Sequence, residues 1–259
     1  MNDVSFAIVN YNRCDVLEEC LAAIYAHAGG IRVEIVVVDN ASTDGSVEMV
    51  REKFPQVKLI VNDHNAGRAI ATNQAIREGS GRYVFVLDND AIVRPGTLPE
   101  MVRFMDKNPR AGLLSCELLN PDGSIQPDYR HLPSWPRLVM RTLGLDKLFP
   151  YNPPAARGGA EGVVEVGAVP GSCMFLRREV TDEVGLMDEQ FIFYLEETDW
   201  CYRIRRAGWE IYLTTKVGVV HYGGFCSGQR ISVPMHLEFY KSILKYYRKH
   251  HGRFGLAAA

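Results

Sequence analysis

The strongest constraint on the fold is a regular alternation of short apolar runs and amphipathic segments across residues 1–116. The apolar runs have the length of strands, and the segments between them repeat their apolar residues with helical spacing. The pattern predicts strands at 4–9, 31–38, 57–61 and 83–87, with helices at 14–28, 43–53 and 65–78. Strands that alternate with helices form a mostly parallel sheet with helices on both faces. The sequence therefore predicts an α/β fold.

The second half of the chain shows a less regular pattern. Residues 120–160 hold seven of the 13 prolines, and we expect a long loop or lid there. The pattern then predicts strands at 163–166 and 172–176, a helix at 196–207, short strands near Ile211 and Val219, and a last helix from about 234 to 250. We therefore expect a single domain followed by a C-terminal helix.

Composition and missing signals exclude several classes of protein. A net charge of −2 over 259 residues argues against nucleic-acid binding. The longest apolar runs fall short of the roughly 18 residues that a membrane-spanning helix needs. Six cysteines without a C-x-x-C pair predict reduced thiols, and the N-terminus lacks the basic start of a signal peptide. We therefore expect a cytoplasmic protein.

Polar residues follow all four strands predicted in the first half, and three of these strand ends are acidic, at the edge where open parallel sheets bind ligands. Asp39 stands between a buried strand and a helix start, where a carboxylate can bind a ribose or a base edge. An ordinary Asx turn is the alternative interpretation. Asp88 and Asp90 follow the strand at 83–87, and two such carboxylates can share one Mg²⁺ or Mn²⁺ with phosphate oxygens. An acidic turn is the alternative there.

Two further groups of candidates lie in the second half. Glu196, Glu197 and Asp199 fall at a predicted helix start, behind an aromatic run. The helix dipole alone favours acids at this position, whereas the functional interpretation is a general base that deprotonates an incoming hydroxyl. His221 ends a short apolar strand and precedes two glycines. It suits a third metal ligand, and an ordinary structural histidine is the alternative.

Taken in this order, the segments resemble the family 2 glycosyltransferases of the GT-A fold, a Rossmann-like architecture. The resemblance extends from about Val4 to about Gly228. Within that family the chain looks most similar to rhamnosyltransferase-type members, which act on cell-envelope or surface polysaccharides, and residues 141–149 contribute to this similarity. The matching stretches are Ile8–Asn12, Val37–Ser46, Asn65–Arg68 with Asn73, Leu87–Asp90, Pro170–Met174, Gly185–Glu189, Glu196–Trp200 and His221.

The resemblance implies a role for each matching residue. Asp90 and His221 match the ligands of Mn²⁺ or Mg²⁺. Glu197 matches the catalytic base, which in many relatives is the Asp of a Glu-Asp pair; the pair here is Glu196-Glu197, and Asp199 is a second catalytic candidate. The positions that match the nucleotide-sugar site are Asn10, Asp39, Asn65, Arg68, Asp88 and Asn89.

The implied activity is inverting, metal-dependent transfer of a sugar from a nucleotide diphosphate donor to a saccharide or polyprenyl-linked acceptor. Residues 1–116 would bind the donor, residues 117–233 would bind the acceptor and carry the base, and residues 234–259 would form an amphipathic helix and tail. A nucleotidyltransferase is an alternative, but residues 10–15 contain no glycine-rich phosphate loop. A non-catalytic sugar-nucleotide-binding module is a third possibility, and the retained acidic residues argue against it.

The last predicted helix is basic and amphipathic. Between Phe239 and Arg253 there are five Lys or Arg residues and no acid. The pattern predicts either contact with the inner face of the cell membrane or packing of the apolar side on the domain. The sequence does not indicate an oligomeric state. The basic side holds Lys241, Lys245 and Arg248, and the apolar side holds Tyr240, Ile243, Leu244 and Tyr247.

Overall fold

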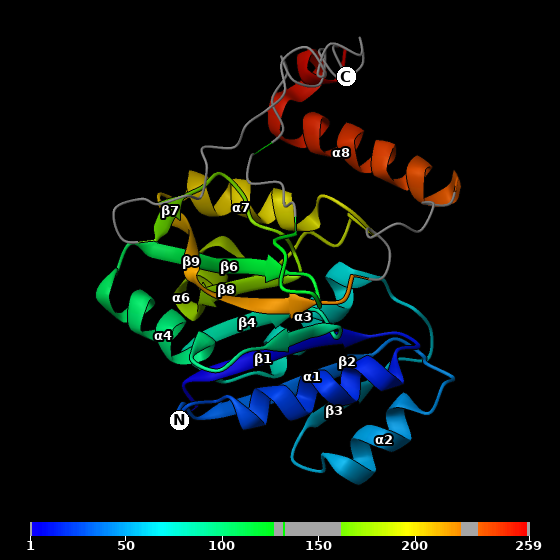
Figure 1. The fold of residues 1–259 in the computed structure, drawn as a ribbon. Helices are drawn as coiled ribbons and strands as arrows, with labels where there is room; N and C mark the ends of the chain where they lie inside the picture. Colours follow the sequence, from blue (N-terminus) through cyan, green and yellow to red (C-terminus); the bar gives the residue numbers. More distant parts are fainter. Residues whose placement is uncertain (1, 127–131, 133–161, 224–232, 258–259) are drawn as a thin grey trace.

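The structure, a computed structural model, describes residues 2–126, 132, 162–223 and 233–257 (Figure 1). The predicted loop at 120–160 therefore falls largely outside the described residues, as do residues 141–149. The strands are β1 (Val4–Asn10), β2 (Val33–Asp39), β3 (Lys58–Val61), β4 (Tyr83–Leu87), β5 (Ala91–Val93), β6 (Ala111–Leu119), β7 (Val163–Glu165), β8 (Cys173–Arg177) and β9 (Glu210–His221). The helices are α1 (Cys14–Ala26), α2 (Ser46–Lys53), α3 (Arg68–Glu78), α4 (Thr97–Lys107), α6 (Arg178–Val184), α7 (Glu196–Arg206) and α8 (Val233–Ala257).

The strands form one nine-stranded sheet in the order β3-β2-β1-β4-β8-β6-β9-β5, and β7 pairs with β9. The four strands from β3 to β4 are parallel to one another. β8 then enters antiparallel between β4 and β6, and β9 is parallel to β6. The sheet is mostly parallel, as predicted, and both halves of the chain contribute strands to it.

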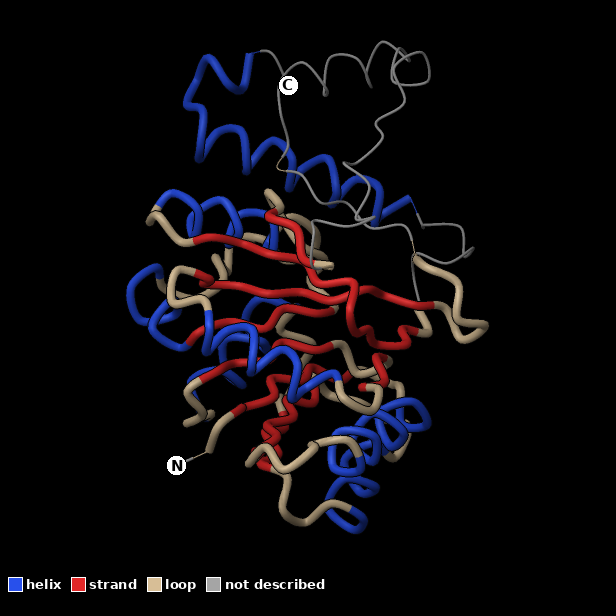
Figure 2. Tube along the Cα trace, turned by 60° about the vertical axis from the view of Figure 1, so that its left-hand side comes forward, coloured by secondary structure: helices blue, strands red, loops and turns tan. Residues whose placement is uncertain are grey.

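Helices cover both faces of the sheet (Figure 2). Each face has its own apolar core. One core joins the sheet to α1, α2 and α4, through side chains such as Leu17, Met49 and Met101. The other joins it to α3, α6 and α7, through side chains such as Ile76 and Trp200. The apolar residues of α1 that recur with helical spacing are all buried, which confirms the sequence pattern. The predicted α/β architecture is therefore confirmed.

The structure differs from the sequence prediction in three places. The two short strands expected near Ile211 and Val219 are one 12-residue strand, β9. A bulge in its pairing with β6 accommodates the polar residues between them, which interrupt the apolar pattern. The sequence does not predict four elements: β5, α4, β6 and α6. Prolines flank α4, whereas α6 follows β8 without a turn. The last helix extends to Ala257, although Gly252 at φ 66° breaks its helical geometry.

Helix α8 packs on the outer side of α7 and belongs to the folded unit (Figures 1 and 2). Tyr246 and Tyr247 are buried in a third apolar cluster with Phe191 and Leu195, which lie directly before α7. Within the described residues, none of the helices combines the length and hydrophobicity required to cross a bilayer. The inner side of α8 therefore stabilises the segment that leads into α7.

Replacing Tyr246 tests whether α8 is part of the fold. Tyr246 is fully buried, whereas Leu244 on the same helix is 43% exposed. We expect Tyr246→Ala to lower the free energy of unfolding by about 3 kcal/mol, as for other large-to-small core changes. Leu244→Ala, the matched control, should change it by less than about 0.5 kcal/mol. Urea unfolding of both variants measures the difference, and equal effects would contradict the packing of α8.

Candidate active site

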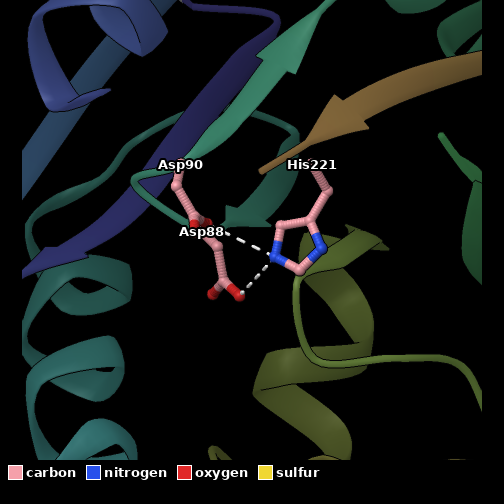
Figure 3. Close-up of side chains that lie close together, drawn as sticks. All are labelled: Asp88, Asp90 and His221. Atoms are coloured by element: carbon pink, nitrogen blue, oxygen red, sulfur yellow. Dashed lines mark ion pairs between the residues drawn. The ribbon is translucent and has the colours of Figure 1, made fainter. Parts of the chain in front are cut away.

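Two strand ends bring Asp88, Asp90 and His221 together at the carboxyl edge of the sheet (Figure 3). Asp88 and Asp90 lie in the turn between β4 and β5, and His221 ends β9. Pairing of β5 with β9 sets Ala91 opposite His221. The His221 Nε2 atom lies 3.3 Å from Asp90 Oδ1 and 3.6 Å from Asp88 Oδ2. The sequence-predicted metal ligands are therefore neighbours in space.

This group fits a divalent cation. One ligand atom from each residue lies within 4.8 Å of the others, and carboxylate oxygens and an imidazole nitrogen are both ligands of divalent cations in proteins. Gln126 orients the imidazole, because His221 Nδ1 lies 2.9 Å from Gln126 Oε1 and the Gln126 amide donates to the His221 carbonyl. Nε2 thereby points at the two carboxylates. An outer partner of this kind is typical of metal-binding histidines.

The charges in this group balance one another. Burial alone would lower the pKa of His221, but hydrogen bonds and attraction from Asp88 and Asp90 outweigh it and raise the pKa to about 9. Burial would raise the pKa of Asp88, yet Arg68 and His221 hold it well below its usual range. Arg13 lies 3.8 Å from Asp90. Each carboxylate therefore faces a cation that compensates its desolvation.

A chain of hydrogen bonds connects the first strand ends to the Asp88–Asp90 turn. The Asn89 amide donates to Asn10 Oδ1 at 2.6 Å, and the Asn10 amide donates to Asp39 Oδ2 at 2.9 Å. Asp39 Oδ1 accepts the backbone N–H of Ser42 at 2.7 Å. Three of the predicted nucleotide-sugar residues thus form one network, in which the buried Asp39 also fixes the loop after β2.

Two further nucleotide-sugar candidates, Asn65 and Arg68, lie at or just before the start of α3 and outside this network. Asn65 is exposed before α3, where its Oδ1 accepts the N–H of Gly67 at 3.0 Å, outside the network described above. Arg68 begins α3, and its guanidinium contacts three distant segments. Its Nη2 atom lies 2.7 Å from Asp88 Oδ1 and donates to the Gly171 carbonyl at 2.6 Å. Its Nε atom lies 3.4 Å from Glu196 Oε1. Arg68 therefore links the group of Asp88, Asp90 and His221 to α7.

The first turn of α7 carries the two adjacent glutamates. Glu196 is buried, and this burial together with repulsion from Glu197 raises its pKa to about 8. Glu197 is half-buried and accepts a hydrogen bond from Thr198 Oγ1 at 2.8 Å. Tyr194 and Leu195, directly before the helix, have φ of 69° and 67°, a left-handed conformation that surrounding packing must hold. The backbone that positions both glutamates is therefore strained.

Asp199, the second catalytic candidate, is not brought to this group. Its fully buried carboxylate lies 2.8 Å from Arg203 Nε, 2.7 Å from Lys249 Nζ and 2.6 Å from His250 Nε2. The contacts with Lys249 and His250 join α7 to α8.

Sequence reasoning missed Gln126, which orients His221. Gln126 lies in the proline-rich segment, and its pairing back toward β6 leaves no local sequence pattern.

The raised pKa of Glu196 predicts a pH-dependent stability. The carboxyl has an ordinary value of 4.5 and a value of about 8 in the folded protein. Between these pH values the folded state holds a proton that the unfolded state has lost, so stability falls as pH rises. Glu196→Gln has no titrating carboxyl at this position. We therefore expect its free energy of unfolding, relative to that of wild type, to increase from pH 4.5 to pH 8. Urea unfolding across this range measures it, and parallel stability curves would contradict the raised pKa.

Known proteins that are similar to this chain include two curated sugar transferases and one solved structure. An N-acetylglucosaminyl-diphospho-decaprenol L-rhamnosyltransferase from Mycobacterium tuberculosis is 29% identical over 236 residues, or 85% of this chain and 76% of that protein. The low-salt glycan biosynthesis hexosyltransferase Agl10 from Haloferax volcanii is 27% identical over 225 residues, or 85% of this chain and 67% of that protein. The crystal structure of TarS from S. aureus matches with a TM-score of 0.64 at 14% identity.

The match to TarS covers 95% of this chain and 39% of the TarS chain, so this chain spans about two fifths of that protein. At this identity the likeness concerns the fold alone, and it confirms the predicted GT-A architecture. The family model described as Glycosyl transferase family 2 matches residues 5–185. That range includes Asp39 at the end of β2 and Asp88 and Asp90 after β4. The chain therefore belongs to glycosyl transferase family 2.

Proposed function

We propose that this glycosyltransferase moves a sugar from a nucleoside diphosphate to a saccharide or lipid-linked saccharide, with inversion, during synthesis of a cell-envelope or surface polysaccharide. The observation that carries the proposal is the convergence of Asp88, Asp90 and His221 at the carboxyl edge of the sheet. The similarity to a rhamnosyltransferase supports rhamnose as the sugar. Family membership favours this function over a nucleotidyltransferase.

The two halves of the chain divide the work in this proposal. Residues 1–116 bind the donor, with Asp39 and Asn10 at the nucleoside and Asp88 at the sugar or ribose. The hydrogen bonds from Asn89 to Asn10 and from Asn10 to Asp39 support this division. They hold the three side chains in one arrangement before a ligand binds. Residues 117–233 supply the acceptor side and the base, and residues 234–259 form the terminal helix and tail.

Asp90 and His221 would hold Mn²⁺ or Mg²⁺, with Asp88 beside them. The bound ion would stabilise negative charge on the departing diphosphate. The orientation of His221 by Gln126 supports this assignment, since it fixes Nε2 toward the carboxylates.

Glu197 acts as the general base in our proposal. Its carboxylate takes the proton from the acceptor hydroxyl while that oxygen attacks the anomeric carbon and the bond to the diphosphate oxygen breaks. A single displacement inverts the anomeric configuration. The hydrogen bond from Thr198 orients Glu197, and Glu196 beside it is anchored by Arg68. Asp199 contributes by fixing α7 on α8.

A panel of nucleoside diphosphate sugars, including a rhamnose donor, tests the function directly. We expect hydrolysis or transfer with a subset of the donors, and more with Mn²⁺ or Mg²⁺ than in chelator. An absence of turnover with every donor would contradict the proposal.

Removing Asp90 tests the metal site. We expect Asp90→Ala to abolish the metal-dependent turnover and to leave the circular dichroism spectrum unchanged. Asp63→Ala is the matched control, because the Asp63 side chain is exposed and pairs with His64 alone among the described residues. Near wild-type activity of Asp90→Ala in excess chelator would show that Asp90 has no metal role.

Replacing each glutamate tests the base. Glu197→Gln keeps the shape of the side chain but cannot accept the proton, so kcat should fall by about 10²- to 10⁴-fold. Donor affinity should change little, because the proposed nucleotide contacts lie at Asp39. Glu196→Gln should reduce kcat less, since the adjacent helix position points about 100° away. Steady-state kinetics with donor calorimetry distinguish them; an inactive Glu196→Gln beside an active Glu197→Gln would reverse the assignment.

A further inference from the structure

The side of α8 that faces away from the domain carries exposed apolar and basic residues. Leu237, Tyr240 and Leu244 are 56%, 59% and 43% exposed. Lys241 and Arg248 are exposed on the same side. At 3.6 residues per turn, these five residues fall within an arc of about 100°. We call this set the outer face of α8.

The opposite side of α8 is fixed to the domain. Tyr246 and Tyr247 are buried, and Ser242 Oγ donates to the Phe193 carbonyl at 3.0 Å. The apolar side predicted from the sequence is therefore divided: Ile243 and Tyr247 pack inward, whereas Tyr240 and Leu244 face outward. Packing on the domain therefore accounts for the inner side of the helix, and among the described residues the outer face stays exposed.

The outer face carries two basic side chains, Lys241 and Arg248. None of its five residues is acidic, and the nearest acid on the helix, Glu238, is already paired with Lys241 at 3.3 Å and Lys245 at 3.6 Å. Among the described residues, Arg248 makes no ion pair. A hollow of about 340 Å³ beside it is lined by Gln190, Lys245, Arg248 and Lys249.

Acids beneath this hollow neutralise only part of its charge. Lys249 is paired with Asp188 at 2.6 Å and with Asp199 at 2.7 Å. A second hollow, of about 370 Å³, adjoins Lys249 and includes Arg206, which makes no ion pair within the described part of the chain. Arg206 and Arg248 therefore leave excess positive charge on the surface that α7 and α8 share.

We propose that the outer face of α8 docks on a membrane surface rich in anionic lipids. The three apolar side chains enter the interfacial region, and Lys241 and Arg248 contact headgroup phosphates, as in helices that lie in the plane of a bilayer. A second copy of this chain is a poorer occupant, because a two-fold contact would bring the cations of both copies together without an acid to pair them.

Docking through this face complements the proposed function without depending on it. The inner side of α8 contacts residues 191–195, directly before the glutamates of α7. A lipid-linked acceptor would therefore meet the catalytic half of the protein close to the bilayer. Vesicle binding can be measured without any sugar transfer, so failure of either proposal is recognised separately.

The test is co-sedimentation of the full chain with vesicles. We expect binding to phosphatidylcholine vesicles that contain phosphatidylglycerol, weaker binding to phosphatidylcholine alone, and weaker binding at high salt. Lys241→Gln with Arg248→Gln should weaken binding about 25-fold, from about fivefold for each cation. Tyr240→Ser with Leu244→Ser should weaken it about tenfold through lost apolar contact.

Matched controls lie on other surfaces. Arg51→Gln with Lys107→Gln removes two exposed cations, and Val61→Ser removes an apolar side chain that is 47% exposed. We expect the controls to bind vesicles like wild type, and thermal unfolding of every variant to match wild type. Point variants are preferable to deletion of α8, which would also remove the buried Tyr246.

Three results would overturn the proposal. The first is binding that does not depend on the anionic lipid. The second is equal binding of wild type and the outer-face variants. The third is self-association of wild type that the outer-face variants lose, with no vesicle binding, which would assign the face to a second copy. Vesicle binding without turnover of any donor would leave docking supported and contradict the proposed sugar transfer instead.

Discussion

The guanidinium of Arg68 holds together three segments that are far apart in the chain. It meets Asp88 after β4, the Gly171 carbonyl before β8, and Glu196 at the start of α7. Each of these groups presents an oxygen atom to the cation, and the attraction of Arg68 for Asp88 offsets the cost of burying both charges. Gly171 permits the approach, because a Cβ atom there would lie 3.2 Å from Arg68 Nη2. The position of Asp88 relative to the glutamates of α7 therefore depends on this one side chain.

The first half of the fold could be predicted from sequence because its signals are local. The strands up to β4 and the helices between them have apolar patterns that a window of a dozen residues reveals. The acidic strand ends could be predicted for the same reason, since parallel strands bring their carboxyl ends to one edge. Asp39, Asp88 and Asp90 illustrate this: Asp39 ends β2, Asp88 follows β4 directly, and Asp90 lies in the same turn.

The second half could not be predicted equally well because its contacts are long-range. The entry of β8 between β4 and β6 is a choice of partner that no local pattern encodes. Gln126 meets His221 across the sheet, and Asp199 is drawn to Lys249 and His250 of α8. For Asp199, the sequence shows an acid at a helix start, and only the position of α8 reveals that its carboxylate is already engaged.

The pairing of β5 with β9 determines when Asp90 and His221 can meet as the nascent chain folds. Among the described strands, β5 pairs with β9 alone, and this contact places His221 beside Asp90. A nascent chain that has emerged only as far as α7 contains both aspartates but lacks the histidine. The group of Asp88, Asp90 and His221 is therefore incomplete in every N-terminal fragment that stops before β9, and its assembly requires the last strand of the sheet.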